Sequence, residues 1–85
     1  MAGEEPIELL PNLGPNSCQW LRNAGITTRQ ELKRYGAVLA FQRVKRQQPR
    51  ASLNLLWALA AALEGKDWRK LTAHEKQRLM EQLED

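Results

Sequence analysis

The run Leu10-Pro11-Asn12-Leu13-Gly14-Pro15 holds the groups of this chain best suited to binding a ligand. We expect it to form the turn of a helix-hairpin-helix, in which Gly14 takes a backbone conformation that side chains resist and Pro15 starts the second helix. The first-turn amides of a helix have no partner within the helix and attract phosphate oxygens. The turn therefore predicts a phosphate-binding site, with nucleic acid as the first ligand to consider.

Basic side chains are concentrated in residues 22–50, which we call the basic block. This block has a formal charge of +7, whereas residues 1–21 carry −3 and residues 51–85 carry −1, within a net charge of +3. Such a concentration suits phosphate or an acidic partner, although a solvated surface without a ligand explains it equally well. No cation occurs between Pro11 and Gln19, so attraction to DNA must come from the basic block.

The predicted DNA contacts come from these two segments. Asn12 stands where DNA-binding hairpins usually have glycine, and it adopts a left-handed backbone less readily than glycine does. The candidate residues are Asn12, Leu13, Gly14, Asn16 and Ser17 in the turn, and Arg22, Arg29, Lys33, Arg43, Arg46 and Arg50 in the basic block.

The sequence has no arrangement of residues typical of an active site. His74 is the only histidine and Cys18 the only cysteine, and they are too far apart in sequence to suggest a zinc site or a Cys-His nucleophile. No glycine-rich phosphate loop occurs. We expect no enzyme, no cofactor and no metal. Cys18 is expected to be a small packed side chain rather than a reactive thiolate, and Trp68 to cover the end of a central helix.

Helix boundaries are marked along most of the chain. A first apolar turn covers 7–10, and the helix after Pro15 runs to Ala24 with Gly25 as its end. Thr28 and Glu31 form a capping box that opens a short helix ending at Tyr35, with Gly36 as its stop. Further helices are predicted over 37–46, over 52–64 with a cap at residue 65, and from 73 to about 83 after a second capping box.

The segment Ser52–Glu64 is apolar nearly all round, which predicts a central helix that the others pack around. No stretch shows the alternation of a strand, and no apolar run has the length of a membrane span. The sequence thus predicts an all-α protein, a compact bundle of five or six short helices with a helix-hairpin-helix-like element. We expect a flexible segment over residues 1–6 and one domain over residues 7–85.

With these boundaries placed, the chain resembles the C-terminal domain of the TfoX/Sxy family, bacterial regulators of DNA-uptake competence. The resemblance covers roughly Ile7 to Leu79 and implies a role in regulation. Full-length members carry an α/β domain before this one, which has no counterpart in these 85 residues, so a stand-alone protein and an excised domain are both open. The matching residues are Leu10–Pro15, Ala24-Gly25-Ile26-Thr27-Thr28, Glu31-Leu32, Gly36-Ala37, Ser52-Leu53-Asn54-Leu55-Leu56, Ala58-Leu59, and Trp68 with Leu71.

Three functions fit this pattern. The first is a non-enzymatic regulatory domain that binds duplex DNA weakly and without sequence preference. The second is a module that uses the same basic face to bind a protein of a transcription or competence system. The third is a structural appendage with no ligand of its own. The single cysteine and the absence of a secretory signal lead us to expect a cytoplasmic location, and the oligomeric state stays open.

Overall fold

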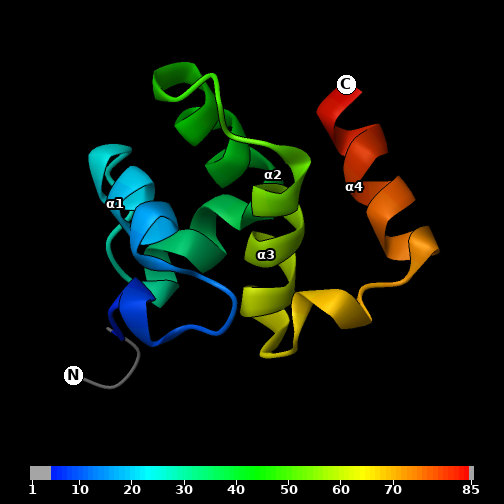
Figure 1. Cartoon of the computed structure of the whole chain (residues 1–85), viewed down its shortest axis with the longest axis horizontal. Helices are drawn as coiled ribbons and strands as arrows, with labels where there is room; N and C mark the ends of the chain where they lie inside the picture. The colour runs from blue at the N-terminus through cyan, green and yellow to red at the C-terminus, as the bar shows by residue number, and fades with distance from the viewer. Residues whose placement is uncertain (1–4, 85) are drawn as a thin grey trace.

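A computed structural model describes residues 5–84 of the chain (Figure 1). Within that range no strand forms, and the β-structure is limited to one isolated bridge between Pro6 and Thr28. The all-α class predicted from the sequence is confirmed. In chain order, the elements are η1 (Ile7–Leu9), α1 (Pro15–Asn23), α2 (Arg29–Gln47), α3 (Leu53–Glu64), η2 (Trp68–Lys70) and α4 (Ala73–Glu84).

The number of helices differs from the predicted five or six, because four α-helices and two 3-10 turns are present. The largest difference lies in α2, which spans both segments that the sequence separates at Gly36. Gly36 has φ 82° and ψ 161°, a conformation that is almost exclusive to glycine, so it kinks the helix. The apolar turn predicted over residues 7–10 is the 3-10 turn η1.

The core is centred on α2 and α3. The side chains of Leu56 and Leu59 on α3 are fully buried, as the apolar character of that segment predicts. The helix that packs against α1, α3 and α4 alike is nevertheless α2, whereas α3 packs mainly on α2 and η2. The prediction that all helices pack around α3 is corrected in this respect. At 19 residues α2 is the longest helix, and its kink lets the two halves reach different neighbours.

The segment before η1 is tied to the start of α2. The Arg29 amide donates to the Glu5 carbonyl at 2.7 Å, and the Ile7 amide donates to the Thr27 carbonyl at 3.2 Å. The flexible segment predicted for residues 1–6 falls mostly on residues 1–4, which lie outside the described residues. Its last two residues, Glu5 and Pro6, are held in place by this pairing.

Both predicted capping boxes are present, with a shift in the first. The Thr28 hydroxyl accepts a hydrogen bond from the Glu31 amide at 3.1 Å, but the Glu31 carboxylate accepts from the Thr27 amide rather than from that of Thr28. In the second box, the amide of Glu75 donates to the Thr72 hydroxyl and the Thr72 amide donates to the Glu75 carboxylate, each at 3.1 Å. None of the helices in the part of the chain that the structure describes is long and apolar enough to cross a membrane.

Candidate functional site

The turn before α1 has its unusual backbone at a different residue from the one predicted. Gly14 has φ −84° and ψ 179°, an extended conformation open to any residue, and an added Cβ there would meet nothing within 4 Å. The prediction that Gly14 takes a strained conformation is wrong. The left-handed residue is Asn12, with φ 72°. Asparagine tolerates this region better than most side chains do, which explains how the turn closes without a glycine at the left-handed position.

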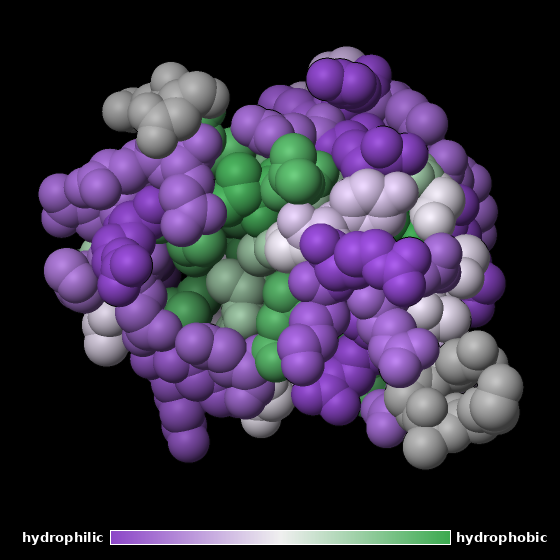
Figure 2. Space-filling view, turned by 180° about the vertical axis from the view of Figure 1, so that it is seen from behind, coloured by the Kyte–Doolittle hydropathy of each residue, from purple (hydrophilic) through white to green (hydrophobic). Residues whose placement is uncertain are grey.

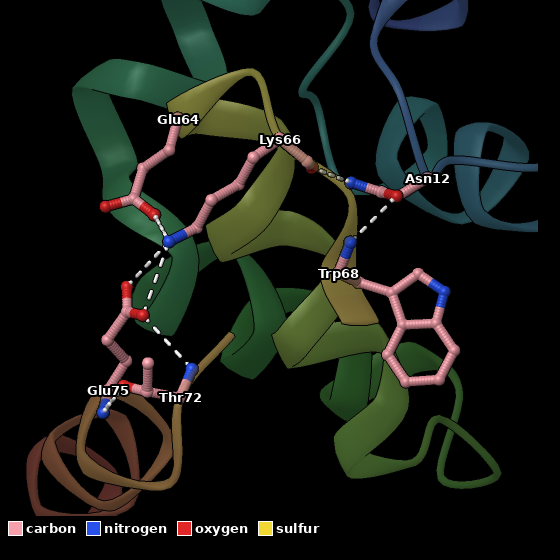
Figure 3. A network of polar contacts seen from close by, with 6 residues as sticks. All are labelled: Asn12, Glu64, Lys66, Trp68, Thr72 and Glu75. Carbon is pink, nitrogen blue, oxygen red and sulfur yellow. Dashed lines mark hydrogen bonds and ion pairs between the residues drawn. The ribbon is translucent and has the colours of Figure 1, made fainter. Parts of the chain in front are cut away.

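The Asn12 side chain is engaged inside the protein. Its Nδ2 donates to the Lys66 carbonyl at 2.7 Å, and its Oδ1 accepts from the Trp68 amide at 3.1 Å (Figure 3). Both ends of the amide are therefore used to join the turn to the chain that follows α3. Asn12, predicted as a DNA contact, acts as a clamp that holds Trp68 beside the turn.

The clamp continues into a small charged network. The Lys66 ammonium lies 3.1 Å from the Glu64 carboxylate and 3.0 Å from that of Glu75, whose capping box begins α4 (Figure 3). Hydrogen bonds to Glu75 and Glu64 raise the pKa of Lys66. The Thr72 amide, followed by Lys66, lowers the pKa of Glu75. Lys66 thus connects the turn, the end of α3 and the start of α4.

An open groove of about 320 Å³ lies between α1 and α3 and ends at this clamp. We call it the α1–α3 groove. Among the described residues that line it none has a carboxylate, and the single charge belongs to Arg50. Its lining consists of Asn12, Ser17, Trp20, Arg50, Ser52, Asn54, Leu55, Ala58 and Trp68.

Both helices bring their first turn to this groove. Ser17 lies in the first turn of α1, and Ser52 and Asn54 lie at the start of α3. The Ser52 side chain makes no capping hydrogen bond. First-turn amides carry partial positive charge, which adds to that of Arg50. The described lining of the groove therefore carries one positive charge and is partly aromatic.

Two of the predicted basic contacts are occupied by interactions within the protein. Arg22 donates through Nε to the Glu8 carboxylate at 2.6 Å. Arg43 donates through Nε and Nη2 to the Ala24 carbonyl, each at 3.3 Å, and its guanidinium lies 4.9 Å from the centre of the Tyr35 ring. Arg43 therefore caps the C-terminal end of α1, where cations are favoured by the helix dipole.

The other basic candidates lie at two ends of α2. Arg29 and Lys33 are exposed in the first turns of α2, beside the segment that precedes η1. Arg46 is exposed near the end of α2, and Arg50 follows in the loop that leads to α3 (Figure 1). The structure brings Arg50 together with Asn12 and Ser17, but it does not gather the whole basic block on that groove.

Sequence reasoning missed the aromatic part of the groove. Trp68 is 39% exposed and lines the groove with Leu55 and Ala58 of α3, rather than simply covering the end of that helix. Trp20 on α1 is half-buried and lines the same groove. The available signal was a tryptophan placed in a short polar connection after Gly65, but the long-range contact with Asn12 is not visible in local sequence.

The cysteine has the structural role that the sequence predicts. Cys18 is 4% exposed and belongs to the core, and burial, with a contribution from the Glu8 charge, raises the pKa of its thiol. A raised pKa disfavours the thiolate, so this side chain is a packed group and not a nucleophile.

A second surface of different character lies between α2 and α4. Seen from behind, the molecule has a hydrophobic strip beside α4 (Figure 2). We call this surface the α2–α4 groove. Leu39 is 53% exposed there, and Glu64, Glu75 and Arg78 place charges of both signs at its edge. Its apolar lining includes Ala37, Val38, Leu39, Ala60, Leu63 and Leu79.

Comparison with known proteins finds one family whose model matches nearly the whole chain. The TfoX C-terminal domain matches residues 4–83. The DNA transformation protein TfoX of Haemophilus influenzae is 34% identical over 76 residues, which cover 89% of this chain and 35% of that protein. The chain thus spans about a third of the length of this curated relative.

Two solved structures from Listeria monocytogenes have the same fold. One is an uncharacterized protein in a triclinic crystal form, with a TM-score of 0.84 and 35% identity, covering 88% of this chain and 85% of that one. The other is a protein of unknown function in a tetragonal form, with a TM-score of 0.84 and 33% identity, covering 92% of this chain and 95% of that one. The fold is therefore shared with experimentally determined structures whose functions are not known.

Proposed function

Because the chain belongs to the TfoX C-terminal domain family, we propose that it is a non-enzymatic regulatory domain that binds DNA weakly and without sequence preference. The Haemophilus influenzae relative is a DNA transformation protein. This chain spans only 35% of that relative, so a role in competence regulation is part of the proposal and not a property carried over from the relative. A cytoplasmic location belongs to the same proposal.

The observation that carries this function is the charge of the α1–α3 groove. Residues from the first turns of α1 and α3 line it together with Arg50, and the described lining residues include no carboxylate. Arg46, four residues before Arg50 and also exposed, adds a second cation near the end of α2, outside the lining of this groove. Phosphates are attracted to helix N-termini and to arginine, and neither interaction requires a particular base sequence.

The affinity is expected to be low. Arg22 is hydrogen-bonded to the Glu8 carboxylate and Arg43 to the Ala24 carbonyl. Fewer cations are therefore available to DNA than the composition suggests. Each neutralised phosphate contributes a slope near −0.9 to a plot of log affinity against log salt concentration. A few such contacts correspond to a dissociation constant on the order of 10–100 μM near physiological salt.

A titration with duplex DNA at two salt concentrations tests the proposal. The double variant Arg46→Ala/Arg50→Ala removes two exposed cations and should flatten the salt slope by about two units while leaving the fold intact. Arg43 is unsuitable for this test because its loss exposes the end of α1. Arg78→Ala, on α4, is the matched control and should leave the slope unchanged. If wild-type protein binds neither duplex nor single-stranded DNA even at low salt, the proposal is wrong.

The α2–α4 groove supports a second function, the binding of a protein partner. The supporting observation is Leu39, which is 53% exposed and lines this groove together with Leu79. The sequence led us to expect such a partner on the basic face, and the apolar groove is a better protein-binding surface. Leu39→Asp should abolish binding of such a partner and leave the DNA titration unchanged. If the domain binds neither DNA nor a protein partner, the third function, a structural appendage with no ligand of its own, is the one that applies.

A further inference from the structure

Trp68 is exposed on a segment whose backbone is held by hydrogen bonds. It lies on η2, its amide donates to Asn12, and the following Arg69 amide donates to the Asp67 carboxylate at 2.9 Å. Figure 3 shows its indole extending away from the polar network and along the side of α3. The side chain is 39% exposed on this hydrogen-bonded backbone, so part of the indole is free to contact a ligand.

The groove beside Trp68 combines apolar side chains with one positive charge. Trp20, Leu55 and Ala58 provide its apolar wall, in contact with the space that Trp68 borders. Arg50 provides the charge, and the hydroxyls of Ser17 and Ser52 provide hydrogen-bonding groups. A ligand that matches this lining has a planar apolar part and a negative charge. A nucleotide has both, in its base and its phosphate.

From this arrangement, we infer that the α1–α3 groove binds an unpaired nucleotide of a single-stranded nucleic acid, with the base stacked on Trp68 and the phosphate at Arg50. The inference rests on the proposed DNA binding and deepens it by naming the form of nucleic acid. Stacking on aromatic side chains tolerates any base, which agrees with binding that is independent of sequence.

The size of the groove favours an unpaired nucleotide over a duplex. Its volume of about 320 Å³ lies at the small end of the range for small-molecule pockets, roughly 300–1000 Å³. In a duplex the faces of the bases are covered by their neighbours in the stack, so Trp68 has no base face to contact. A single strand offers its base faces without the cost of opening a duplex.

The test compares a single strand with a duplex. An oligothymidylate roughly ten nucleotides long and its duplex with oligoadenylate are titrated against the whole chain at low salt, with binding followed by fluorescence anisotropy of a dye on the DNA. We expect the single strand to bind more tightly than the duplex. Trp68→Ala should weaken single-strand binding by roughly 5- to 150-fold, and Trp68→Phe, which keeps an aromatic ring, should retain most of it.

Two controls separate stacking from charge and from folding. An abasic phosphodiester strand keeps the phosphates, so its binding should depend on Arg50 and be the same for wild type and Trp68→Ala. Leu39→Ala removes an exposed apolar side chain from the α2–α4 groove and should leave every titration unchanged. Far-ultraviolet circular dichroism checks that each variant is folded.

The outcomes distinguish this inference from the proposed function. If the duplex binds and Trp68→Ala has no effect on the single strand, the inference is wrong while the DNA-binding proposal stands. If the duplex binds and the single strand does not, the inference is likewise wrong and the DNA-binding proposal stands. If wild-type protein binds neither form at low salt, both the inference and the proposed function are wrong.

Discussion

The two grooves of this small protein share α3 as a wall, yet they differ in almost every property that selects a ligand. The α1–α3 groove uses Leu55 and Ala58 of that helix, together with Arg50 and two tryptophans, and its described lining residues have no carboxylate. The α2–α4 groove uses Ala60 and Leu63, and its edge carries acids and a base. One apolar helix thus borders a groove with a single positive charge on one side and a groove with charges of both signs on the other, because the neighbouring elements supply the charges.

The elements that border the two grooves are also held in place by different interactions. On the α1–α3 side, the two hydrogen bonds of Asn12 hold the turn against the chain after α3. On the α4 side, the capping box of Thr72 and Glu75 and the ion pair with Lys66 hold the start of the last helix. Lys66 takes part in both, through its carbonyl on one side and its ammonium on the other.

The largest expected effect comes from the wall that both grooves share. Leu59→Ala should lower the free energy of unfolding by about 2–5 kcal/mol, because the fully buried side chain leaves a cavity. Leu53→Ala, the same change on the same helix at a 38% exposed position, should cost less than about 1 kcal/mol. Urea denaturation measures both. Equal losses would mean that α3 is not the buried wall described here.

The next effect is confined to the α1–α3 side. Asn12→Ala removes two hydrogen bonds and forces a Cβ-bearing residue without a polar side chain into φ 72°, so we expect a loss of about 2–3 kcal/mol. Asn12→Gly removes the same hydrogen bonds but accepts the backbone, and should lose about 1 kcal/mol. Thermal and urea denaturation compare the two variants. Should glycine cost more than alanine, the left-handed conformation at this position would be contradicted.

A similar comparison applies to the α2 kink beside the α2–α4 groove. Gly36→Ala should destabilise the protein by about 1–3 kcal/mol, because φ 82° with ψ 161° is open almost only to glycine. Gly14→Ala should cost only about 0.5 kcal/mol, since the backbone there is extended, nothing lies near the added Cβ, and only the preference of the α1 N-cap for glycine over alanine is lost. The melting temperatures of the two variants should therefore separate clearly, and coincident values would count against the kink.

The smallest effect is the pH dependence of the stability that Glu75 contributes through its capping box and its ion pair with Lys66 at the start of α4. The pKa of Glu75 is lowered from 4.5 in the folded protein, so its contribution is present above pH 4.5 and is lost as the pH falls through the lowered pKa. Glu75→Gln cannot titrate. The difference in melting temperature between wild type and this variant should be largest near pH 7 and shrink below pH 4.5. A difference that stays constant down to pH 3 would contradict the network.

Local signals account for what the sequence could predict. The capping boxes, the proline in the first turn of α1 and the left-handed Gly65 after α3 each depend on neighbours within a few residues, and they place most helix ends correctly. The apolar pattern of 52–64 likewise reveals a buried helix. The all-α class follows from such signals, and the family resemblance is confirmed by the comparison.

Contacts between distant residues explain what the sequence could not predict. Asn12 meets Lys66 and Trp68 across more than fifty positions, so neither its left-handed backbone nor its clamp could be inferred from the turn alone. The basic block appeared to be one surface, whereas Arg43 caps α1 and Arg22 pairs with Glu8. Only the folded chain reveals that Arg50 and the tryptophans border one groove. The candidate site was therefore predicted in part, through Asn12, Ser17 and Arg50.

A titration of isotopically labelled protein with the single-stranded oligothymidylate, followed by two-dimensional NMR, tests whether nucleic acid binds in the α1–α3 groove. Binding there predicts the largest shifts at the indole Nε1–H of Trp68 and at the amides of Ser17, Arg50 and Asn54, which border the groove. Amides of Leu39 and Leu79 in the α2–α4 groove should not move. Shifts confined to that second groove, or no shifts at low salt, would contradict binding in the α1–α3 groove.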